Sequence, residues 1–271
     1  MVTRPATPAP HSLMPLVTDP ARLKRAARQL MRRGGSPGAD AITWAQYRNG
    51  LDARITALAG RLRDGTWTPG PVRPLVIPSW GKTLPLAIPA AEDRIVHRAV
   101  RVAAEPVLVM TGAYPPWMYG WRPRAGRVEA LTAAAAHLAV GRTWVADLDV
   151  AAATSGATPE EAMSWIARWI SDGSFLRLIR LVTASLPAPL SPGSGLTPML
   201  TNLRLTRADE QLGGVAVIRF TDNYTAFCRS RGEAEEAAAR ITAALAASGL
   251  RPNTAKSKIW RPNPEDLYLA G

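Results

Sequence analysis

The sequence has few of the side chains that form disulfides or bind soft metals. Its single cysteine, Cys228, cannot form a disulfide within the chain and indicates a reducing compartment. The three histidines, His11, His97 and His137, are too scattered to join that cysteine in a zinc site of the usual spacing. These shortages exclude disulfide-stapled folds and zinc modules.

Long hydrophobic runs are also missing. No apolar stretch approaches the ~20 residues that a helix needs to cross a bilayer. Residues 1–20 hold five prolines and lack the apolar core of a secretory signal. We therefore expect a cytoplasmic protein without a membrane span, and a disordered tail over residues 1–20.

Acidic residues are outnumbered by basic ones. The chain of 271 residues has 33 Lys and Arg against 21 Asp and Glu, a formal net charge of +12. Such an excess fits binding to a polyanion, of which nucleic acid is the commonest. The high Ala, Pro and Arg content also fits a soluble protein from a high-GC genome, so the charge alone leaves both interpretations open.

Helical and strand-like patterns are interleaved along the chain. Helices are predicted over 21–33, 44–63, 91–109 (bent or ended near Pro106), 127–139, 159–171, 175–184, 198–212 and 233–248, and strands over 72–77, 83–88, 144–150, 215–220, 224–228, 256–260 and 267–269. Helices interleaved with a small, mostly antiparallel sheet indicate an α+β fold.

The first of these helices carries a basic face. Asp19-Pro20 is a good start signal, with the acid as N-cap and proline in the first turn. The candidate phosphate contacts on this helix are Arg22, Arg25, Arg28 and Arg32. A solvated basic face and a surface that binds a nucleic-acid backbone explain this pattern equally well.

Two predicted strands end in acidic side chains. Asp149 ends the strand over 144–150, and Asp222 lies at the tip of the hairpin over 215–228, followed by Asn223. Two strand-end carboxylates are what a protein needs to hold Mg²⁺ against phosphates. Asp-Asn is also an ordinary hairpin turn, so this motif by itself leaves both interpretations open.

Five sequence blocks occur in a particular order. They are Asp-Arg at 93–94, Tyr-Gly-Trp-Arg-Pro at 119–123, Asp-Leu-Asp at 147–149, Gly-Leu-Thr-Pro-Met-Leu-Thr-Asn at 195–202 and Phe-Thr-Asp-Asn at 220–223. This order resembles the fingers and palm of bacterial reverse transcriptases, and the nearest likeness is to the group II intron type. The resemblance runs from residue 38 to the end of the chain.

The resemblance implies a right-hand polymerase fold, with a small antiparallel palm sheet packed on helices. An N-terminal helix and fingers are expected over 21–125 and a palm over 126–271. The likeness ends at the start of the primer-grip region, so no thumb is expected. In the family, two palm carboxylate sites hold two Mg²⁺ ions. Asp149 and Asp222 match these positions, and Asn223 takes the place of the second hairpin acid.

Other positions depart from the family pattern at the expected nucleotide and template contacts. Thr154 replaces an aromatic residue that packs under the incoming sugar, and Pro192-Gly193 lies in the altered template-grip turn. The basic residues expected at 79 and 84 are Ser and Leu, and Lys82 is the nearest substitute. The family residue is kept at five other positions, which are Asp93, Arg94, Arg122, Pro198 and Asn202. The chain thus matches the family at residues that support the fold, and the resemblance makes Arg122 a candidate template contact.

Three functions follow from this pattern. The favoured one is a reverse transcriptase-like domain that binds RNA or an RNA/DNA hybrid, with weak Mg²⁺ binding and with polymerase activity lost or strongly impaired, as in a pseudoenzyme. The second is an active RNA-directed DNA polymerase that uses Asp149 and Asp222 with two Mg²⁺ ions. The third is a structural subunit whose protein partner takes the place of the thumb.

Overall fold

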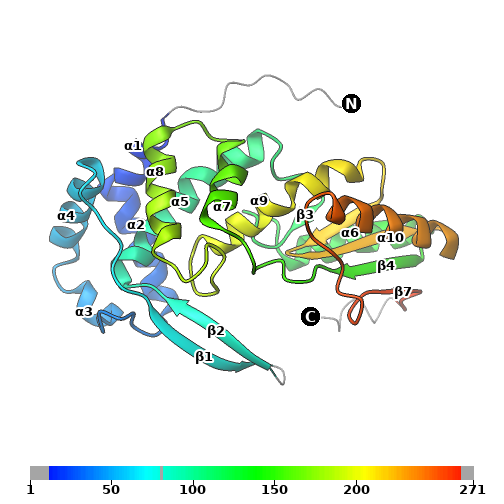
Figure 1. Ribbon diagram of the computed structural model, residues 1–271, viewed down its shortest axis with the longest axis horizontal. Coiled ribbons are helices and arrows are strands. Elements are labelled where there is room, and N and C mark those ends of the chain that lie inside the picture. The colour runs from blue at the N-terminus through cyan, green and yellow to red at the C-terminus, as the bar shows by residue number, and fades with distance from the viewer. Residues whose placement is uncertain (1–11, 80–81, 264–271) are drawn as a thin grey trace. The chain divides into compact units, whose positions relative to one another are not determined.

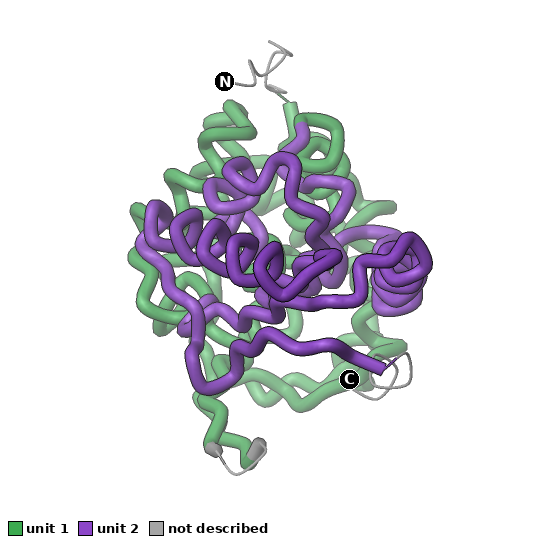
Figure 2. Tube along the Cα trace, turned by 90° about the vertical axis from the view of Figure 1, so that its right-hand side faces the viewer, with its two compact units in different colours: residues 1–111, 154–200 green, residues 112–153, 201–271 purple. Residues whose placement is uncertain are grey.

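The computed structural model describes residues 12–79 and 82–263 and divides the chain into two compact units. Unit 1 combines residues 1–111 with 154–200, and unit 2 combines 112–153 with 201–271 (Figure 2). The units interleave along the sequence, so they do not coincide with the expected division at residue 125. Within the described residues, no helix is both long and apolar enough to span a membrane.

Unit 1 is mostly helical. Its helices are α1 (Met14–Thr18), α2 (Pro20–Arg33), α3 (Trp44–Arg48), α4 (Leu51–Arg63), α5 (Ala91–Met110), α7 (Pro159–Ala167) and α8 (Gly173–Ala184) (Figure 1). The expectation of disorder over residues 1–20 is wrong for Met14–Thr18, which form helix α1. Leu13 and Val17 are buried, and the Asp172 carboxylate accepts hydrogen bonds from the backbone N–H groups of Leu13 and Met14. Residues 1–11 lie outside the described part of the chain.

Helix α2 begins and ends as its sequence predicts. The Asp19 side chain accepts a hydrogen bond from the Ala21 N–H, Pro20 occupies the first helical position, and Gly34 follows the last turn with φ 71°. Leu23 and Ala27 are buried on the inner face. The helix therefore packs through a narrow apolar stripe, and its basic residues are left on the outer side.

Two helices of unit 1 differ from the prediction. The helix expected over 44–63 is divided into α3 and α4 at Gly50, which has φ 70°. Helix α5 continues past Pro106 to Met110, where a bend or an end was expected. Pro106 is exposed while Ala103 and Val107 on the inner face are buried, so packing offsets the backbone hydrogen bond that proline cannot make.

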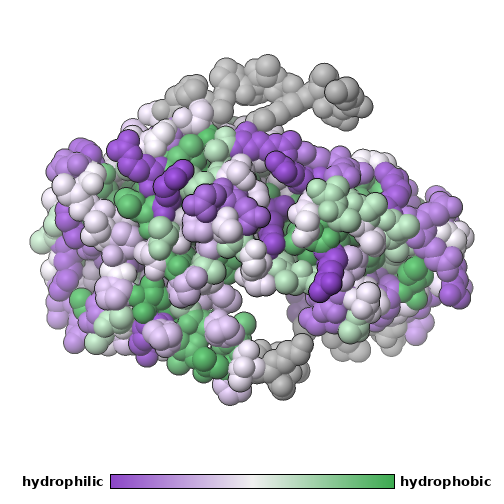
Figure 3. Space-filling model, in the orientation of Figure 1, coloured by the Kyte–Doolittle hydropathy of each residue, from purple (hydrophilic) through white to green (hydrophobic). Residues whose placement is uncertain are grey.

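The predicted hairpin of unit 1 is confirmed. Strands β1 (Arg73–Ser79) and β2 (Lys82–Ile88) pair antiparallel, from Arg73 opposite Ile88 to Ser79 opposite Lys82. Val76 and Leu84 are exposed on this hairpin, and hydrophobic residues gather over it in Figure 3.

Unit 2 is built on a five-stranded sheet in the order β3-β5-β6-β4-β7. The strands are β3 (Met118–Tyr119), β4 (Trp144–Asp149), β5 (Val217–Phe220), β6 (Asn223–Cys228) and β7 (Lys258–Trp260). All neighbours pair antiparallel except β3 and β5, which are parallel. The helical elements are α6 (Arg127–Ala139), α9 (Thr197–Asp209, in unit 2 from residue 201), η1 (Glu210–Leu212) and α10 (Arg231–Ala246). The α+β class is confirmed, and the strand expected at 267–269 lies outside the described residues.

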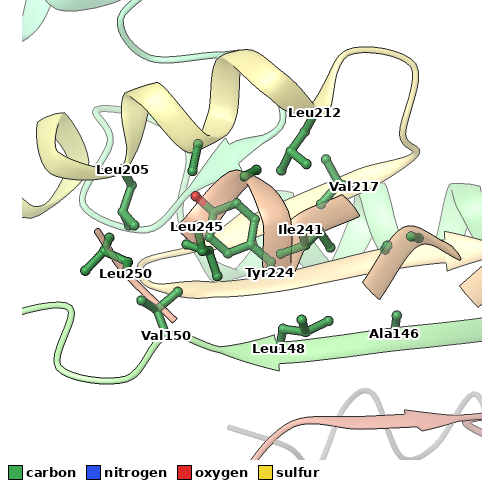
Figure 4. Close-up of a cluster of buried hydrophobic side chains, with 14 of the residues drawn as sticks. Ala146, Leu148, Val150, Leu205, Leu212, Val217, Tyr224, Ile241, Leu245 and Leu250 are labelled. Atoms are coloured by element: carbon green, nitrogen blue, oxygen red, sulfur yellow. The ribbon is translucent and has the colours of Figure 1, made fainter. Parts of the chain in front are cut away.

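The two faces of this sheet carry alternate residues of each strand. On one face Leu148 and Tyr224 pack with Leu205 of α9 and with Ile241 and Leu245 of α10 (Figure 4). On the other face Val145, Ile218 and Phe227 pack with Ala130 and Ala134 of α6. Because strand side chains alternate, Asp147 and Asp149 share the second face with Val145, as Asn223 and Thr225 do with Phe227.

Candidate functional site

The structure brings the three candidate catalytic residues to neighbouring strand ends in unit 2. Asp149, the last residue of β4, lies directly opposite Asn223, the first residue of β6. Asp222 directly precedes Asn223 at the tip of the hairpin. The chain segments that hold Asp149, Asp222 and Asn223 therefore meet at one edge of the sheet, while the catalytic role of these residues stays a prediction.

The hairpin tip is a two-residue loop with a strained backbone. Phe220 pairs with Asn223, which leaves Thr221 and Asp222 as the loop. Thr221 has φ 56°, a conformation that costs a β-branched residue about 1–3 kcal/mol. Its backbone N–H donates to the Tyr119 carbonyl at 2.9 Å, and its hydroxyl donates to the Asp222 carboxylate at 3.0 Å. These bonds fix the loop that carries Asp222.

Gly120 lies tightly against this loop. Gly120 has φ 67°, and a Cβ atom built on it would lie 2.8 Å from Cγ2 of Thr221. Both the backbone conformation and the close approach require glycine. The Tyr-Gly block of the sequence thus serves to lay β3 beside β5 and to support the tip of the hairpin.

A buried ion pair holds the hairpin to helix α9. The Arg219 guanidinium donates to both carboxylate oxygens of Asp209, from Nε at 3.0 Å and from Nη2 at 2.6 Å. Burial by itself would lower the pKa of Arg219, but the Asp209 carboxylate more than offsets this and the pKa is raised. From Nη1, Arg219 also donates to the Thr221 carbonyl at 2.7 Å. The ion pair therefore positions the strained loop directly.

Two further buried side chains complete this network. Asn202 accepts a hydrogen bond from Nη1 of Arg219 at 2.9 Å, and the Tyr224 hydroxyl donates to Asp209 at 2.7 Å. Burial raises the pKa of Tyr224 well above its usual value, so the hydroxyl stays protonated and acts as a donor. Asn202, the last residue of the sequence block at 195–202, thus supports the hairpin from within the fold.

Asn223 makes its side-chain contacts with Asp147 and Thr225. The Asn223 amide donates from Nδ2 to Oδ1 of Asp147 at 2.5 Å, and the Thr225 hydroxyl donates to the same oxygen at 3.2 Å. These residues lie at the polar end of a groove of about 580 Å³, whose other walls are largely apolar side chains of α6 and the sheet. Sequence reasoning missed Asp147 as a partner of Asn223, although the spacing of two residues from Asp149 predicts a shared face.

A lysine lies beside the first candidate acid. Nζ of Lys256 is 3.5 Å from Oδ2 of Asp149, and both side chains are partly or largely exposed. The Asn253 N–H donates to the Asp149 carbonyl at 2.7 Å and so holds the Lys256 segment near the end of β4. Lys256 was not predicted as a site residue, because 107 residues separate it from Asp149.

The donors at these strand ends suit Mg²⁺ only in part. Carboxylate oxygens such as those of Asp149 and Asp222 are the ligands that Mg²⁺ prefers. Among the described residues, no group of three or more His, Cys, Asp or Glu side chains converges on one point. The Asn223 amide adds an oxygen without charge and is bonded through its nitrogen to Asp147. We therefore derive no catalytic step that depends on a metal.

Arg122 makes contacts within the fold. Its Nη1 donates to the carbonyl oxygens of Pro115, Pro116 and Met118, at 3.0, 3.0 and 3.3 Å. These bonds hold the loop that leads into β3. The contacts of this candidate template-binding residue are therefore structural ones.

The other nucleotide and template candidates lie in unit 1. Pro192 accepts a hydrogen bond from the Ala87 N–H at 2.8 Å. A Cβ atom on Gly193, which has φ 101°, would lie 2.4 Å from the Ala87 carbonyl oxygen. This pair therefore packs closely on the backbone of β2. Thr154 is half-buried in the turns after β4, and Lys82 is the first residue of β2, with a side chain outside the described part of the structure.

The four arginines proposed as backbone contacts all lie exposed on α2. They are Arg22, Arg25, Arg28 and Arg32. Nε of Arg22 lies 3.5 Å from the Asp19 carboxylate, an exposed pair of small energetic value. Arg25, Arg28 and Arg32 follow at spacings of three and four residues and therefore share one face. Their binding to nucleic acid stays a prediction.

Comparison with known proteins adds a relative of similar sequence. No family model matches the chain. Protein YkfC of Escherichia coli strain K12 is 29% identical over 221 residues, which cover 74% of this chain and 56% of that protein. Two solved structures, a partial Cas6-RT-Cas1–Cas2 complex and a Cas6-RT-Cas1–Cas2 complex, each contain a chain similar to this one, with a TM-score of 0.48 and 17% identity. In both, the matched region covers 88% of this chain. It covers 42% of the chain in the partial complex and 26% of the chain in the other complex. The chain spans about half the length of the curated relative that it matches.

Proposed function

We propose that this chain is a reverse transcriptase-like domain that binds nucleic acid and whose polymerase activity is lost or strongly impaired. One observation carries the proposal: Asp149 lies opposite Asn223, the residue that directly follows Asp222, where two strands of the unit 2 sheet end. The sequence blocks resemble those of group II intron reverse transcriptases, in which a second acid follows the first at the hairpin tip. An uncharged amide stands at that position here.

The contacts around these residues reduce the negative charge offered to divalent ions. Transfer of a nucleotidyl group by two metal ions depends on carboxylates that offset the charge of both ions. In this chain the Asn223 amide donates to Asp147, and the Lys256 ammonium lies beside Asp149. Mg²⁺ would be held by Asp149 and Asp222, and weakly.

The distribution of positive charge supports nucleic-acid binding. The chain carries a formal net charge of +12, and Arg25, Arg28 and Arg32 form an exposed face on α2. Exposed arginines at helical spacing suit the phosphates of a strand, because the guanidinium group binds phosphate with paired hydrogen bonds. RNA or an RNA/DNA hybrid is the proposed ligand.

A primer-extension assay with purified protein tests the loss of activity. We expect no product above background with Mg²⁺ or Mn²⁺ on an RNA template. The matched control is Asp222→Ala, which should give the same background. Robust extension by the unmodified protein that disappears in Asp222→Ala would show instead that the chain is an active RNA-directed DNA polymerase.

A further inference from the structure

Unit 1 contains two half-buried arginines with buried guanidinium nitrogen atoms that lack an acceptor. Nε and Nη2 of Arg73, and the same two atoms of Arg94, are buried with no hydrogen-bond partner among the described residues. Neither side chain forms an ion pair in the part of the chain that the structure describes. Buried charged donors are normally paired, because leaving them unpaired costs free energy.

The two arginines belong to segments that lie against each other. Arg73 begins β1, and three residues earlier the Gly70 N–H donates to the Asp93 carboxylate at 2.9 Å. Arg94 follows Asp93 in the first turns of α5. Burial lowers the pKa of Arg94, and the positive charge of Arg73 lowers it further. The two positive charges therefore repel each other.

The surroundings of Arg94 hold its guanidinium group in place. Its Cζ atom lies 4.6 Å from the centre of the Trp44 ring, and the Trp44 indole N–H donates to the Gly34 carbonyl at 3.1 Å. A Cβ atom on Gly35 would lie 3.7 Å from Nη1 of Arg94. Gly38 approaches the start of α5 so closely that a Cβ atom would lie 2.6 Å from the Pro89 carbonyl oxygen. The loop after α2 thus packs beside Arg94 and restricts the movement of its side chain.

The carboxylates nearby do not satisfy these nitrogen atoms. Asp40 lies close enough to raise the pKa of Arg94 but forms no ion pair with a described residue, and its Oδ1 accepts a hydrogen bond from the Ile42 N–H at 3.3 Å. Asp93 uses Oδ2 for Gly70, and burial raises its pKa to about 6. An oxygen acceptor from outside the chain would satisfy these nitrogen atoms.

We propose that Arg73 and Arg94 form a phosphate-binding site that takes one phosphate of a bound nucleic-acid strand. Two guanidinium groups present planar donors that match phosphate oxygens, and stacking on Trp44 orients one of them. The assignment of the ligand to a strand rests on the proposed function. The proposed site gives Arg94 a role in binding, whereas the sequence blocks suggested that Arg94 supports the fold.

The first experiment measures the melting temperature in sodium phosphate and in sodium chloride at equal ionic strength. We expect phosphate to raise the melting temperature of the unmodified protein and of Arg63→Gln, an exposed arginine of the same unit. Arg73→Gln should lose this increase. Arg73→Lys, which keeps the charge and preserves folding, should retain part of it. An equal increase in Arg73→Gln and Arg63→Gln, or none in the unmodified protein, would overturn the site.

The second experiment identifies the source of the phosphate through the salt dependence of single-stranded RNA binding. Loss of one phosphate contact reduces the log–log salt slope by about 0.7. We expect that reduction for Arg73→Gln and no change for Arg63→Gln. One outcome is phosphate stabilisation that depends on Arg73, with no RNA binding by any form of the protein. It would contradict the proposed function and the assignment of the phosphate to a strand, but the phosphate site itself would stand. Titration with a nucleoside triphosphate would then raise the melting temperature in a way that depends on Arg73. RNA binding with equal slopes in both variants would overturn the strand assignment and leave the proposed function intact.

Discussion

Asn223 and Asp147 lie on neighbouring strands, and the amide of the first donates a hydrogen bond of 2.5 Å to the carboxylate of the second. An aspartate at residue 223 could not make this contact at neutral pH, because its ionised carboxylate would repel Asp147. The contact gives the strand ends of unit 2 an internal partner for one acidic side chain. The hydrogen bond therefore stabilises the polar end of the sheet.

Introducing a carboxylate at this position should make stability depend on Mg²⁺. Asn223→Asp removes the donor and places a like charge beside Asp147, which we expect to lower the free energy of unfolding by about 1–3 kcal/mol in EDTA at pH 7. Added Mg²⁺ should recover part of the loss. Asn223→Ala removes the same bond without a new charge and should show no Mg²⁺ response in denaturant unfolding. Equal responses of the two variants would contradict this explanation.

The Arg219–Asp209 pair should contribute strongly to stability. Removing one partner of a buried ion pair costs about 3–5 kcal/mol, because the other charge is left buried and unpaired. Arg219→Met should therefore destabilise unit 2 by that amount in urea unfolding. The double variant Arg219→Met with Asp209→Leu should lose much less than the sum of the two single changes. Simple additivity would show that the two side chains act independently.

Stability should fall as the pH rises through the titration of Asp93. Burial raises the pKa of Asp93 from 3.8 to about 6, so between these values the native state holds a proton that the unfolded state releases. The resulting loss of stability is about 2–3 kcal/mol between pH 4 and pH 7. In Asp93→Asn this contribution is absent, so the variant should gain stability relative to the unmodified protein as the pH rises. A constant difference across this range would refute the prediction.

The basic face of α2 should contribute to RNA affinity through charge. Arg25→Glu with Arg28→Glu should reduce the log–log salt slope for single-stranded RNA by about 1.4, at about 0.7 for each lost phosphate contact. Folding should be preserved, because exposed substitutions usually change stability by about 0.5 kcal/mol or less. The matched control is Arg177→Glu with Arg180→Glu, an exposed pair of the same spacing on α8. Equal slopes for the two pairs would remove α2 from the binding surface.

Local patterns predicted most elements of the fold. Alternating apolar residues and turn signals indicated both hairpins, and the N-cap at Asp19 indicated the start of α2. The helix α1 was missed because its stability comes from contacts far along the chain, such as those of Asp172 with Leu13. Proline at 106 suggested a helix end, but burial of the inner face of α5 outweighs the loss of one backbone bond.

The candidate site was predictable only where its residues lie at strand ends. The positions of Asp149 and Asp222 follow from the ends of two predicted strands. Lys256 could not be paired with Asp149 from the sequence, because the contact depends on how β7 returns to the edge of β4. The internal contacts of Arg122 were likewise hidden, since an arginine in a motif does not show whether its acceptors are phosphates or backbone carbonyls.

The most direct test of the central claim is one titration of a primer annealed to an RNA template, with binding and extension measured in the same samples. We expect the hybrid to be bound at low salt, the affinity to fall steeply as salt rises, and the primer to stay unextended with all four deoxynucleotides and Mg²⁺ present. Asp222→Ala should bind with nearly the same affinity, because removing an acid near phosphates removes no contact. Extension of the bound primer, or absence of binding at low salt, would contradict the account.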